Sequence, residues 1–475
     1  MSIVIGGGEK RRIVFPYDDF RQNQGENILK ISDFISSKGK GVLVFRGSTG
    51  IGKTPIVLAS ALVSPNIKRI FYVSSTKNLQ EQARKIAEAF VGVNSNRKII
   101  VNQLRGRRNY TCLRDTEKSA DACTSSRVRP CPYKPRNSDT MSGGARYIIC
   151  KNGSVKILPE KMCDYYRIKS EIIPAKDDIE IVVMTTQYLI AEALFAEEIN
   201  PADFIVFDEG RHLEGQLVNA TSLQIDDGTL NYIFGYEYPI TCDVSNYNEV
   251  SIFLKELLYM LNIRMKELEA ESKVVSTKKD EFVVARKRDV VARNIEMIMY
   301  IQRNWDINNI VIDRFTSRKY KRESNCLRLR FVDVSKPFNK IFSEMIMSNG
   351  AFCLMSATMQ TEEYIRETFN IKGDLLYLNV NSGWNKRNRP VIIMKGLRLN
   401  ARNIDEKKYE VFDILSKIID ITSSYGKNLL VHTHSNKIRN FLVDCFMDDD
   451  RIISHDLPDM GHPNSAIEAF DYFCS

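Results

Sequence analysis

A glycine-rich segment near the N-terminus has the residue types and the spacing of a phosphate-binding loop. It consists of Gly47, Ser48, Thr49, Gly50, Ile51, Gly52, Lys53 and Thr54. Glycines let backbone N–H groups curve around phosphate oxygens, and the N-terminus of a following helix adds the positive end of its dipole. We therefore expect a nucleoside triphosphate site, with Lys53 on the β- and γ-phosphates and the Thr54 hydroxyl on Mg²⁺.

An acidic pair has the form that the second half of such a site requires. Asp208 and Glu209 directly follow the apolar run Phe204–Phe207, which is typical of a buried strand. A carboxylate at that position can hold Mg²⁺, and its neighbour can orient the attacking water. The sequence therefore predicts that Asp208 binds the metal and Glu209 acts in hydrolysis. The alternative is an acidic pair that only caps a helix.

Half of the ten cysteines are gathered in one part of the chain. They are Cys112, Cys123, Cys131, Cys150 and Cys163. Four thiolates can hold a [4Fe–4S] cluster, and they can equally hold Zn²⁺. The spacing is not that of the tight pairs in a zinc ribbon, so it predicts a metal site without choosing the metal.

The same part of the chain concentrates positive charge. From Arg105 to Ser170 there are 15 Lys or Arg and 6 Asp or Glu, so the local excess equals the net charge of +9 of the whole chain. The residues in question are Arg105, Arg107, Arg108, Arg127, Arg129, Lys134 and Arg136, interleaved with Tyr110, Tyr133, Tyr165 and Tyr166. Cations contact phosphates and aromatic rings stack on unpaired bases, which favours a path for single-stranded nucleic acid. The alternative is a solvated basic surface with packed tyrosines.

Short apolar runs predict the strands that position these residues. The runs are Val42–Phe45, Ile70–Val73, Ile181–Met184, Phe204–Phe207 and Phe352–Met355, with a second set at Val391–Met394, Leu429–His432 and Arg451–Ile453. Because helical or turn signals follow the runs, they predict doubly wound α/β layers. Two stretches between residues 216 and 335 have helical periodicity and predict a helical insertion.

No stretch approaches the roughly 20 apolar residues that a membrane span needs. The first twelve residues are glycine-rich and then basic, without the apolar core of a secretory signal. We therefore expect an intracellular protein without a membrane partner, and a prokaryotic or viral cytoplasmic location before a nuclear one.

Taken in chain order, these residues resemble the motifs of the iron–sulfur helicases of superfamily 2, the XPD and DinG group. The matching segments are Phe15-Pro16-Tyr17 with Arg21 and Gln24, Gly47–Thr54, Ser75-Thr76, Gly106–Cys112, Cys163–Arg167, Thr186–Tyr188, Ser356-Ala357-Thr358, Ser382–Pro390 and Leu429–Ser435. The resemblance implies that the nucleotide is ATP, that Gln24 recognises adenine and that Phe15 and its aromatic neighbours stack on it. It also implies a [4Fe–4S] cluster on Cys112, Cys123, Cys131 and Cys163, with Cys150 as an alternate ligand and zinc as the alternative metal.

The fold implied by the resemblance is α/β, with a P-loop RecA-like motor domain, an inserted Fe–S module, a helical arch-like insertion and a partial second RecA-like domain. The expected segments are 1–105, 166–215 and 336–384 for the first motor domain, 106–165 for the cysteine-rich module, 216–335 for the helical insertion and 385–475 for the second domain.

Two features depart from the family's pattern. Arg211 stands where the family has His, so it can donate hydrogen bonds to the γ-phosphate or to Ser356-Ala357-Thr358 but cannot accept them. We count it among the candidate catalytic residues. The family's motifs V and VI, with their arginine fingers, are not recognisable before Ser475. This predicts a fragment, or a second chain that completes the site.

The sequence therefore predicts an ATP-dependent DNA helicase that moves on single-stranded DNA, or on a single-strand–duplex junction, and unwinds 5′ to 3′ by resemblance. A second hypothesis is an ATP- and nucleic-acid-binding subunit with little turnover of its own. A third is a zinc-containing P-loop NTPase that acts on something other than DNA.

Overall fold

The computed structural model describes most of the first 381 residues and two helices beyond them. The described ranges are 3–7, 10–21, 23–37, 41–95, 98–119, 131–138, 146–150, 153–171, 178–274, 277–319, 322–381, 403–426 and 435–446, with the single residues 429, 431 and 433. The chain divides into two compact units, Met1–Gly383 and Trp384–Ser475. The units are described separately.

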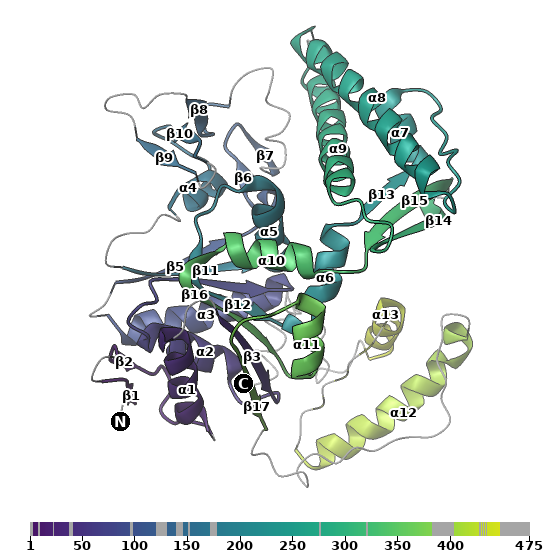
Figure 1. The fold of residues 1–475 in the computed structure, drawn as a ribbon. Helices are drawn as coiled ribbons and strands as arrows, with labels where there is room; N and C mark the ends of the chain where they lie inside the picture. Colours follow the sequence, from purple (N-terminus) through teal and green to yellow (C-terminus); the bar gives the residue numbers. More distant parts are fainter. Residues whose placement is uncertain are drawn as a thin grey trace. The chain divides into compact units, whose positions relative to one another are not determined.

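A seven-stranded sheet forms the centre of the first unit, with the strand order β17-β3-β16-β12-β4-β11-β5 (Figure 1). The strands are β3 (Gly41–Gly47), β4 (Arg69–Ser74), β5 (Ile99–Leu104), β11 (Ile179–Thr185), β12 (Ala202–Asp208), β16 (Ile346–Ser356) and β17 (Leu375–Val380). Every neighbouring pair is parallel. The predicted α/β fold class is therefore confirmed, and the five predicted runs of the first set are the five inner strands.

Helices cover both faces of this sheet. One core contains side chains of α1 (Gln24–Ser37), α2 (Lys53–Val63) and α3 (Lys77–Val93), and the opposite core contains those of α5 (Thr186–Ala191), α6 (Leu213–Ala220), α10 (Ser335–Glu344) and α11 (Glu362–Phe369). Alternate residues of β3 enter opposite cores: Leu43 faces the first and Val44 the second. Burial on both faces explains why the inner strands are continuous apolar runs.

The two edge strands, β5 and β17, were not predicted. β5 includes Asn102 and Gln103, and most residues of both strands are only half-buried. An edge strand is packed on fewer sides, so its apolar pattern is weaker. β17 is nevertheless paired with β3 over six residues, and the Ser48 N–H donates to the Val380 carbonyl (3.0 Å).

The insertion between residues 216 and 335 is not purely helical, which corrects the sequence prediction. It contains α7 (Asp227–Phe234), α8 (Tyr247–Val274) and α9 (Lys278–Arg303), and also an antiparallel sheet with the order β13-β15-β14. Its strands are β13 (Leu223–Asp226), β14 (Ile310–Lys319) and β15 (Arg322–Phe331). In β15, Leu327 and Leu329 are buried while Arg328 and Arg330 are not. This alternation of buried leucines and outer arginines is the signal of a half-buried strand, and it differs from the continuous apolar runs used to predict the inner strands.

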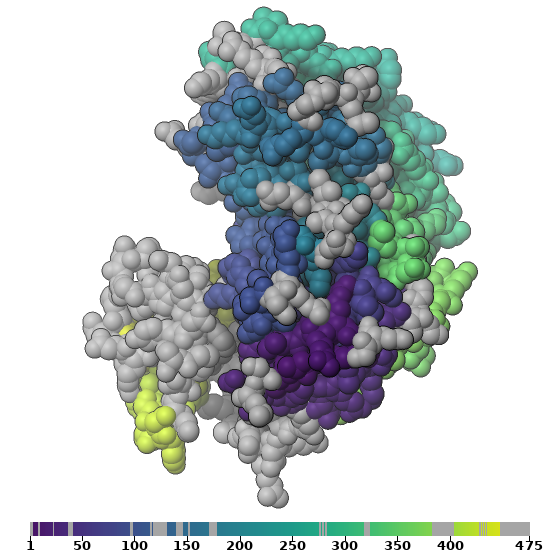
Figure 2. Space-filling view, turned by 90° about the vertical axis from the view of Figure 1, so that its left-hand side faces the viewer, coloured from purple at the N-terminus to yellow at the C-terminus, as the bar shows by residue number. Residues whose placement is uncertain are grey.

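The cysteine-rich module is built from short elements. They are η1 (Arg107–Asn109), β6 (Thr111–Cys112), β7 (Asp115–Ser119), β8 (Arg136–Ser138), β9 (Tyr147–Ile149), β10 (Val155–Ile157) and α4 (Asp164–Glu171). β6 pairs with β7, and β10 lies between β8 and β9, all antiparallel. Cys163 and Tyr165 enter the second core of the seven-stranded sheet, so the module packs directly on the sheet and its helices (Figure 2).

In the second unit the structure describes α12 (Ile404–Ser424) and α13 (Asn436–Cys445). The predicted strands Val391–Met394 and Arg451–Ile453 and the predicted linker Ser382–Pro390 lie outside the described residues, and Leu429–His432 is described only in part. Within the described ranges, no helix combines the length and apolar character needed to cross a membrane.

Candidate nucleotide site and nucleic-acid interface

The glycine-rich loop connects β3 to α2, as its sequence predicts. Gly50 and Gly52 have positive φ angles of 86° and 77°, and Gly52 caps the N-terminus of α2. A Cβ atom at Gly47 would lie 2.5 Å from the Ile51 side chain, and one at Gly52 would lie 2.3 Å from Gln24 Nε2. Ser48 and Thr49 lie in the turn between these positions. Only glycine fits this tight loop, and the tightness is what a phosphate cradle requires.

Lys53 is held inside the loop. Its Nζ donates to the Gly47 carbonyl (3.0 Å). Burial lowers the pKa of Lys53, while the negative charges of Asp208 and Glu209 act in the opposite direction. The lysine therefore lies within electrostatic reach of the acidic pair, as a nucleotide site requires.

The two predicted magnesium ligands, Thr54 and Asp208, are both hydrogen-bonded to the hydroxyl of Tyr72. The Tyr72 hydroxyl donates to Asp208 Oδ2 (3.0 Å) and shares a hydrogen bond with Thr54 Oγ1 (2.9 Å). Mg²⁺ prefers oxygen ligands, so the Thr54 hydroxyl and the Asp208 carboxylate form a donor set that fits it. Burial raises the pKa of Asp208, and the hydrogen bond from Tyr72 lowers it. Tyr72 was not predicted; its signal is a phenol in an otherwise apolar buried strand, which requires a polar partner.

Glu209 is fixed by its backbone and by a neighbouring strand. It has a positive φ of 54°, a conformation that costs free energy for a residue with a side chain. The Ser356 hydroxyl, at the end of β16, donates to Glu209 Oε2 (2.7 Å). A Cβ atom on Gly210 would lie 3.1 Å from the Leu354 Cα. The chain after β12 thus turns against β16 and aims the Glu209 carboxylate at Ser356.

Arg211 connects the acidic segment to the residues after β16. Its Nη1 donates to Thr358 Oγ1 (2.7 Å), and its Nε donates to His212 Nε2 (3.0 Å). Gln360 Nε2 lies 3.4 Å from the Arg211 carbonyl, to which it donates. Arg211 was expected to donate to the γ-phosphate or to the segment Ser356-Ala357-Thr358. The structure shows its bond to this segment, at Thr358.

Two of the residues expected to bind adenine, Arg21 and Gln24, form hydrogen bonds to the glycine-rich loop. Gln24 Nε2 donates to the Ile51 carbonyl (2.8 Å), Gln24 Oε1 accepts from the Arg21 N–H (2.9 Å), and the Arg21 guanidinium contacts the Gly50 carbonyl. Phe15 is only 2% exposed, and its ring packs in the core, which does not support the prediction that it stacks on adenine. The aromatic residues with exposed rings beside it are Tyr17 and Phe20.

Four of the five clustered cysteines are described, and all four are buried: Cys112, Cys131, Cys150 and Cys163. Burial raises the pKa of Cys163, and the nearby thiols of Cys131 and Cys112 raise it further. These three cysteines therefore lie within electrostatic reach of one another. Cys123 lies outside the described residues. In the part of the chain that the structure describes, no group of three or more His, Cys, Asp or Glu side chains is arranged to hold a metal ion.

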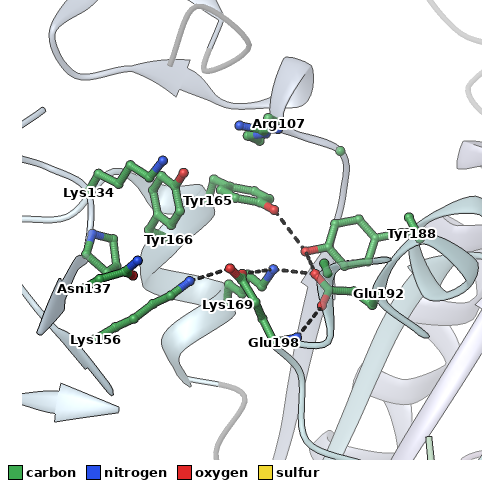
Figure 3. Close-up of a pocket in the computed structure, with 14 residues that line it drawn as sticks. Arg107, Lys134, Asn137, Lys156, Tyr165, Tyr166, Lys169, Tyr188, Glu192 and Glu198 are labelled. Carbon is green, nitrogen blue, oxygen red and sulfur yellow. Dashed lines mark hydrogen bonds and ion pairs between the residues drawn. The ribbon is translucent and has the colours of Figure 1, made fainter. Parts of the chain in front are cut away.

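A cavity of about 630 Å³ lies between the module and the helices that follow β11 of the seven-stranded sheet (Figure 3). Its polar lining includes Arg107, Lys134, Asn137, Lys156, Tyr165, Tyr166, Lys169, Tyr188, Glu192 and Glu198. Arg107, Lys134, Tyr165 and Tyr166 were expected at a nucleic-acid path. The other charged residues come from elements far apart in sequence, so no local pattern marks them.

The lining residues form a connected polar network. Lys169 pairs with Glu198 (2.6 Å) and also contacts Glu192, while Lys156 contacts Glu198. The hydroxyls of Tyr165 and Tyr188 are 3.1 Å apart, and Tyr188 donates to Glu192 Oε1 (3.1 Å). The network joins β10 and α4 of the module to α5 and the π-helix η3 (Glu192–Ala196), which follow β11 of the seven-stranded sheet.

Other predicted residues of the basic segment have different positions. Arg105 pairs with Glu81 (3.0 Å) on α3. The Tyr110 ring packs edge-on against Tyr165, with 5.7 Å between the ring centroids. Arg127 and Arg129 lie outside the described residues. The predicted path is therefore supported mainly by the cavity, and Arg105 and Tyr110 have structural contacts.

Comparison with known proteins gives matches of two kinds. The family model described as "Type III restriction enzyme, res subunit" matches residues 18–235, which include the loop and the acidic pair. No curated protein matches the chain. A solved structure titled XPD helicase is 16% identical, with a TM-score of 0.47, and the match covers 93% of this chain and 77% of that one.

Two further solved structures have similar titles. A truncated XPD is 16% identical, with a TM-score of 0.38, and the match covers 74% of this chain and 98% of that one. A structure titled XPD apo is 15% identical, with a TM-score of 0.40, over 94% and 76% of the two chains.

Proposed function

We propose that this chain is an ATP-dependent motor of the superfamily 2 helicase type, which hydrolyses ATP while it is bound to single-stranded DNA. The observation that carries the proposal is the convergence of three adjacent strands. β3 leads to the glycine-rich loop, β12 ends at Asp208, and β16 ends at Ser356. Parallel strands bring their carboxyl ends to one edge of the sheet, where α/β proteins bind their ligands.

Each side chain at this edge has a role in hydrolysis. The loop amides and Lys53 would bind the phosphates, and Thr54 and Asp208 would hold Mg²⁺, which neutralises phosphate charge when it is bound. Glu209, fixed by Ser356, would orient the attacking water and accept its proton. Arg211 would connect this centre to Thr358.

The cavity next to the cysteine module supports a nucleic-acid partner. Arg107 and Lys134 supply positive charge, and the half-buried Tyr166 supplies aromatic surface, which are the groups that bind single strands. Unwinding and its 5′ to 3′ direction belong to this proposal. So does a [4Fe–4S] cluster on Cys112, Cys131 and Cys163, with Cys123 or Cys150 as the fourth ligand, and zinc is the alternative metal.

A second candidate is a subunit that binds ATP and nucleic acid but turns over little without a second chain that supplies arginine fingers. Arg211 favours it, because a guanidinium bonded to Thr358 cannot change its charge as a histidine can.

A hydrolysis assay with the full chain separates the two candidates. The motor proposal expects ATP hydrolysis that single-stranded DNA stimulates and that Lys53→Ala abolishes. Nucleotide binding without hydrolysis, with or without DNA, would favour the subunit. Absence of nucleotide binding would contradict both.

A further inference from the structure

Tyr72 occupies a position in the sheet that packing alone does not explain. It lies on β4, opposite Val183 of β11 and Val206 of β12, and it is fully buried. Its ring is part of the core that β4 shares with α2. An apolar side chain would fill that space equally well, yet this phenol extends its hydroxyl to the nucleotide site.

The hydrogen bonds of the Tyr72 hydroxyl have one consistent direction. A phenol has one proton, and Asp208 Oδ2 as a carboxylate oxygen can only accept, so Tyr72 donates to Asp208 (3.0 Å). Thr54 must then donate its own proton to the Tyr72 oxygen (2.9 Å). This leaves the lone pairs of the Thr54 oxygen available for a cation.

The second oxygen of the same carboxylate is also fixed. Asp208 Oδ1 accepts from the Glu209 N–H (3.0 Å). Both oxygens of Asp208 therefore have a donor, and one of the two donors is Tyr72. Carboxylates that ligate metals are commonly oriented by such partners.

We infer that Tyr72 is a positioning residue for a divalent cation: its hydroxyl orients the Asp208 carboxylate and turns the lone pairs of Thr54 toward the metal. The inference rests on the proposed nucleotide site and adds a residue to it. Tyr72 is separated from the cation by its two partners, so it acts through them. Loss of the hydroxyl weakens cation binding more than it weakens the binding of the nucleotide itself.

Cation binding tests the inference without hydrolysis. Tyr72→Phe removes only the hydroxyl, and Tyr247→Phe is the matched control, because Tyr247 donates to the Ile310 carbonyl in the insertion (3.3 Å). Mn²⁺ serves as the probe, measured by electron paramagnetic resonance with a non-hydrolysable ATP analogue. We expect Tyr72→Phe to weaken Mn²⁺ binding about 10- to 100-fold, the usual effect of losing a group that orients a metal ligand. Analogue binding in EDTA stays within about twofold of wild type, and Tyr247→Phe changes neither quantity.

A double-mutant cycle distinguishes positioning from a general loss of packing. Asp208→Asn removes one of the two groups through which Tyr72 acts, so adding Tyr72→Phe to it weakens Mn²⁺ affinity less than Tyr72→Phe does alone. Additive losses, or unchanged Mn²⁺ affinity in a folded Tyr72→Phe protein, would overturn the inference while the proposed function stands. A wild-type chain that binds no analogue would overturn the proposed function instead, and this inference with it.

Discussion

The nucleotide site and the cysteine module differ in the interactions that hold their side chains in place. The nucleotide site lies at the end of a seven-stranded sheet that is covered on both faces, and its side chains are fixed by hydrogen bonds such as Tyr72–Asp208 and Ser356–Glu209. The strands of the module have two to five residues. Small units with little core commonly need a metal or another staple. The comparison indicates that packing and hydrogen bonds organise the first site, and that the proposed cluster would supply to the second site what packing does not.

The largest expected effect is that of Lys53→Ala, which should reduce ATP hydrolysis without changing DNA binding. Lys53→Ala removes the cation that the loop holds beside the phosphates, and we expect ATP hydrolysis to fall at least about 100-fold, as when one transition-state donor is lost. Binding of single-stranded DNA, measured by fluorescence anisotropy, stays near that of wild type. Lys98→Ala, which removes an exposed lysine paired with Asp178, is the control and leaves both unchanged. Equal loss of hydrolysis and DNA binding would show that the two regions are not independent.

The converse experiment removes the metal from the module. We expect Cys163→Ser to lose most of its bound iron and to weaken single-strand binding about tenfold, because Tyr166, which lines the cavity, is three residues from this cysteine. Nucleotide affinity remains unchanged, because the sheet does not depend on the metal. Cys326→Ser changes a buried thiol of the insertion and should keep the iron. Iron retained in Cys163→Ser would refute the ligand assignment. Zinc in the wild-type protein would show that the bound metal is zinc and not an iron–sulfur cluster.

A smaller effect on ATP hydrolysis is expected when Arg211, within the nucleotide site, is replaced. Arg211→Ala removes the bond to Thr358, and loss of one such hydrogen bond, worth about 1 kcal/mol, predicts about a fivefold fall in DNA-stimulated hydrolysis. Basal nucleotide affinity should change little. Arg366→Ala, which removes an arginine paired with Glu362, is the control. If DNA stimulates Arg211→Ala as strongly as wild type, Arg211 has no part in coupling.

The smallest expected effect concerns stability at the junction of the two regions. Burial alone would raise the pKa of Glu198, but the charge of Lys169 and hydrogen bonds from Lys156 and Lys169 outweigh it and lower this pKa from 4.5 to about 2. A lowered pKa stabilises the folded state above pH 4.5, and this contribution is lost as the pH falls from 4.5 toward 2. Since Glu198 is partly exposed, we expect about 1 kcal/mol. Urea unfolding across this range should show a steeper loss for wild type than for Glu198→Gln, and parallel curves would contradict the assignment.

The sequence predicts those parts of the molecule in which function depends on adjacent residues. Gly47–Thr54 and Asp208–Glu209 follow directly on apolar strands, so the spacing locates both halves of the nucleotide site. Tyr72 could not be found this way, because its partners Thr54 and Asp208 come from two other elements. An aromatic residue in the sequence of a buried strand usually indicates only that its side chain packs in the core.

The same reasoning explains what was missed elsewhere. Lys156, Lys169, Glu192 and Glu198 meet only because β10 and α4 pack beside η3. β15 alternates buried leucines with outer arginines instead of forming a continuous apolar run, and the edge strands β5 and β17 lack the uniform burial of the inner ones. Phe15 shows the opposite error: a motif resemblance assigned a ligand contact to a ring that the core encloses.

The pairing of β17 with β3 also has a mechanical consequence. β17 is the last strand before the chain leaves the first unit, and it is joined to β3 along the whole register from Leu375–Val42 to Val380–Gly47. A pull on the chain along the axis of β17 would load all of these pairs at once, in shear, instead of opening them one by one. Its final residue also accepts a hydrogen bond from Ser48. Tension on the following segment would therefore reach the phosphate-binding loop both through the paired strand, which ends at Gly47, and through the bond to Ser48.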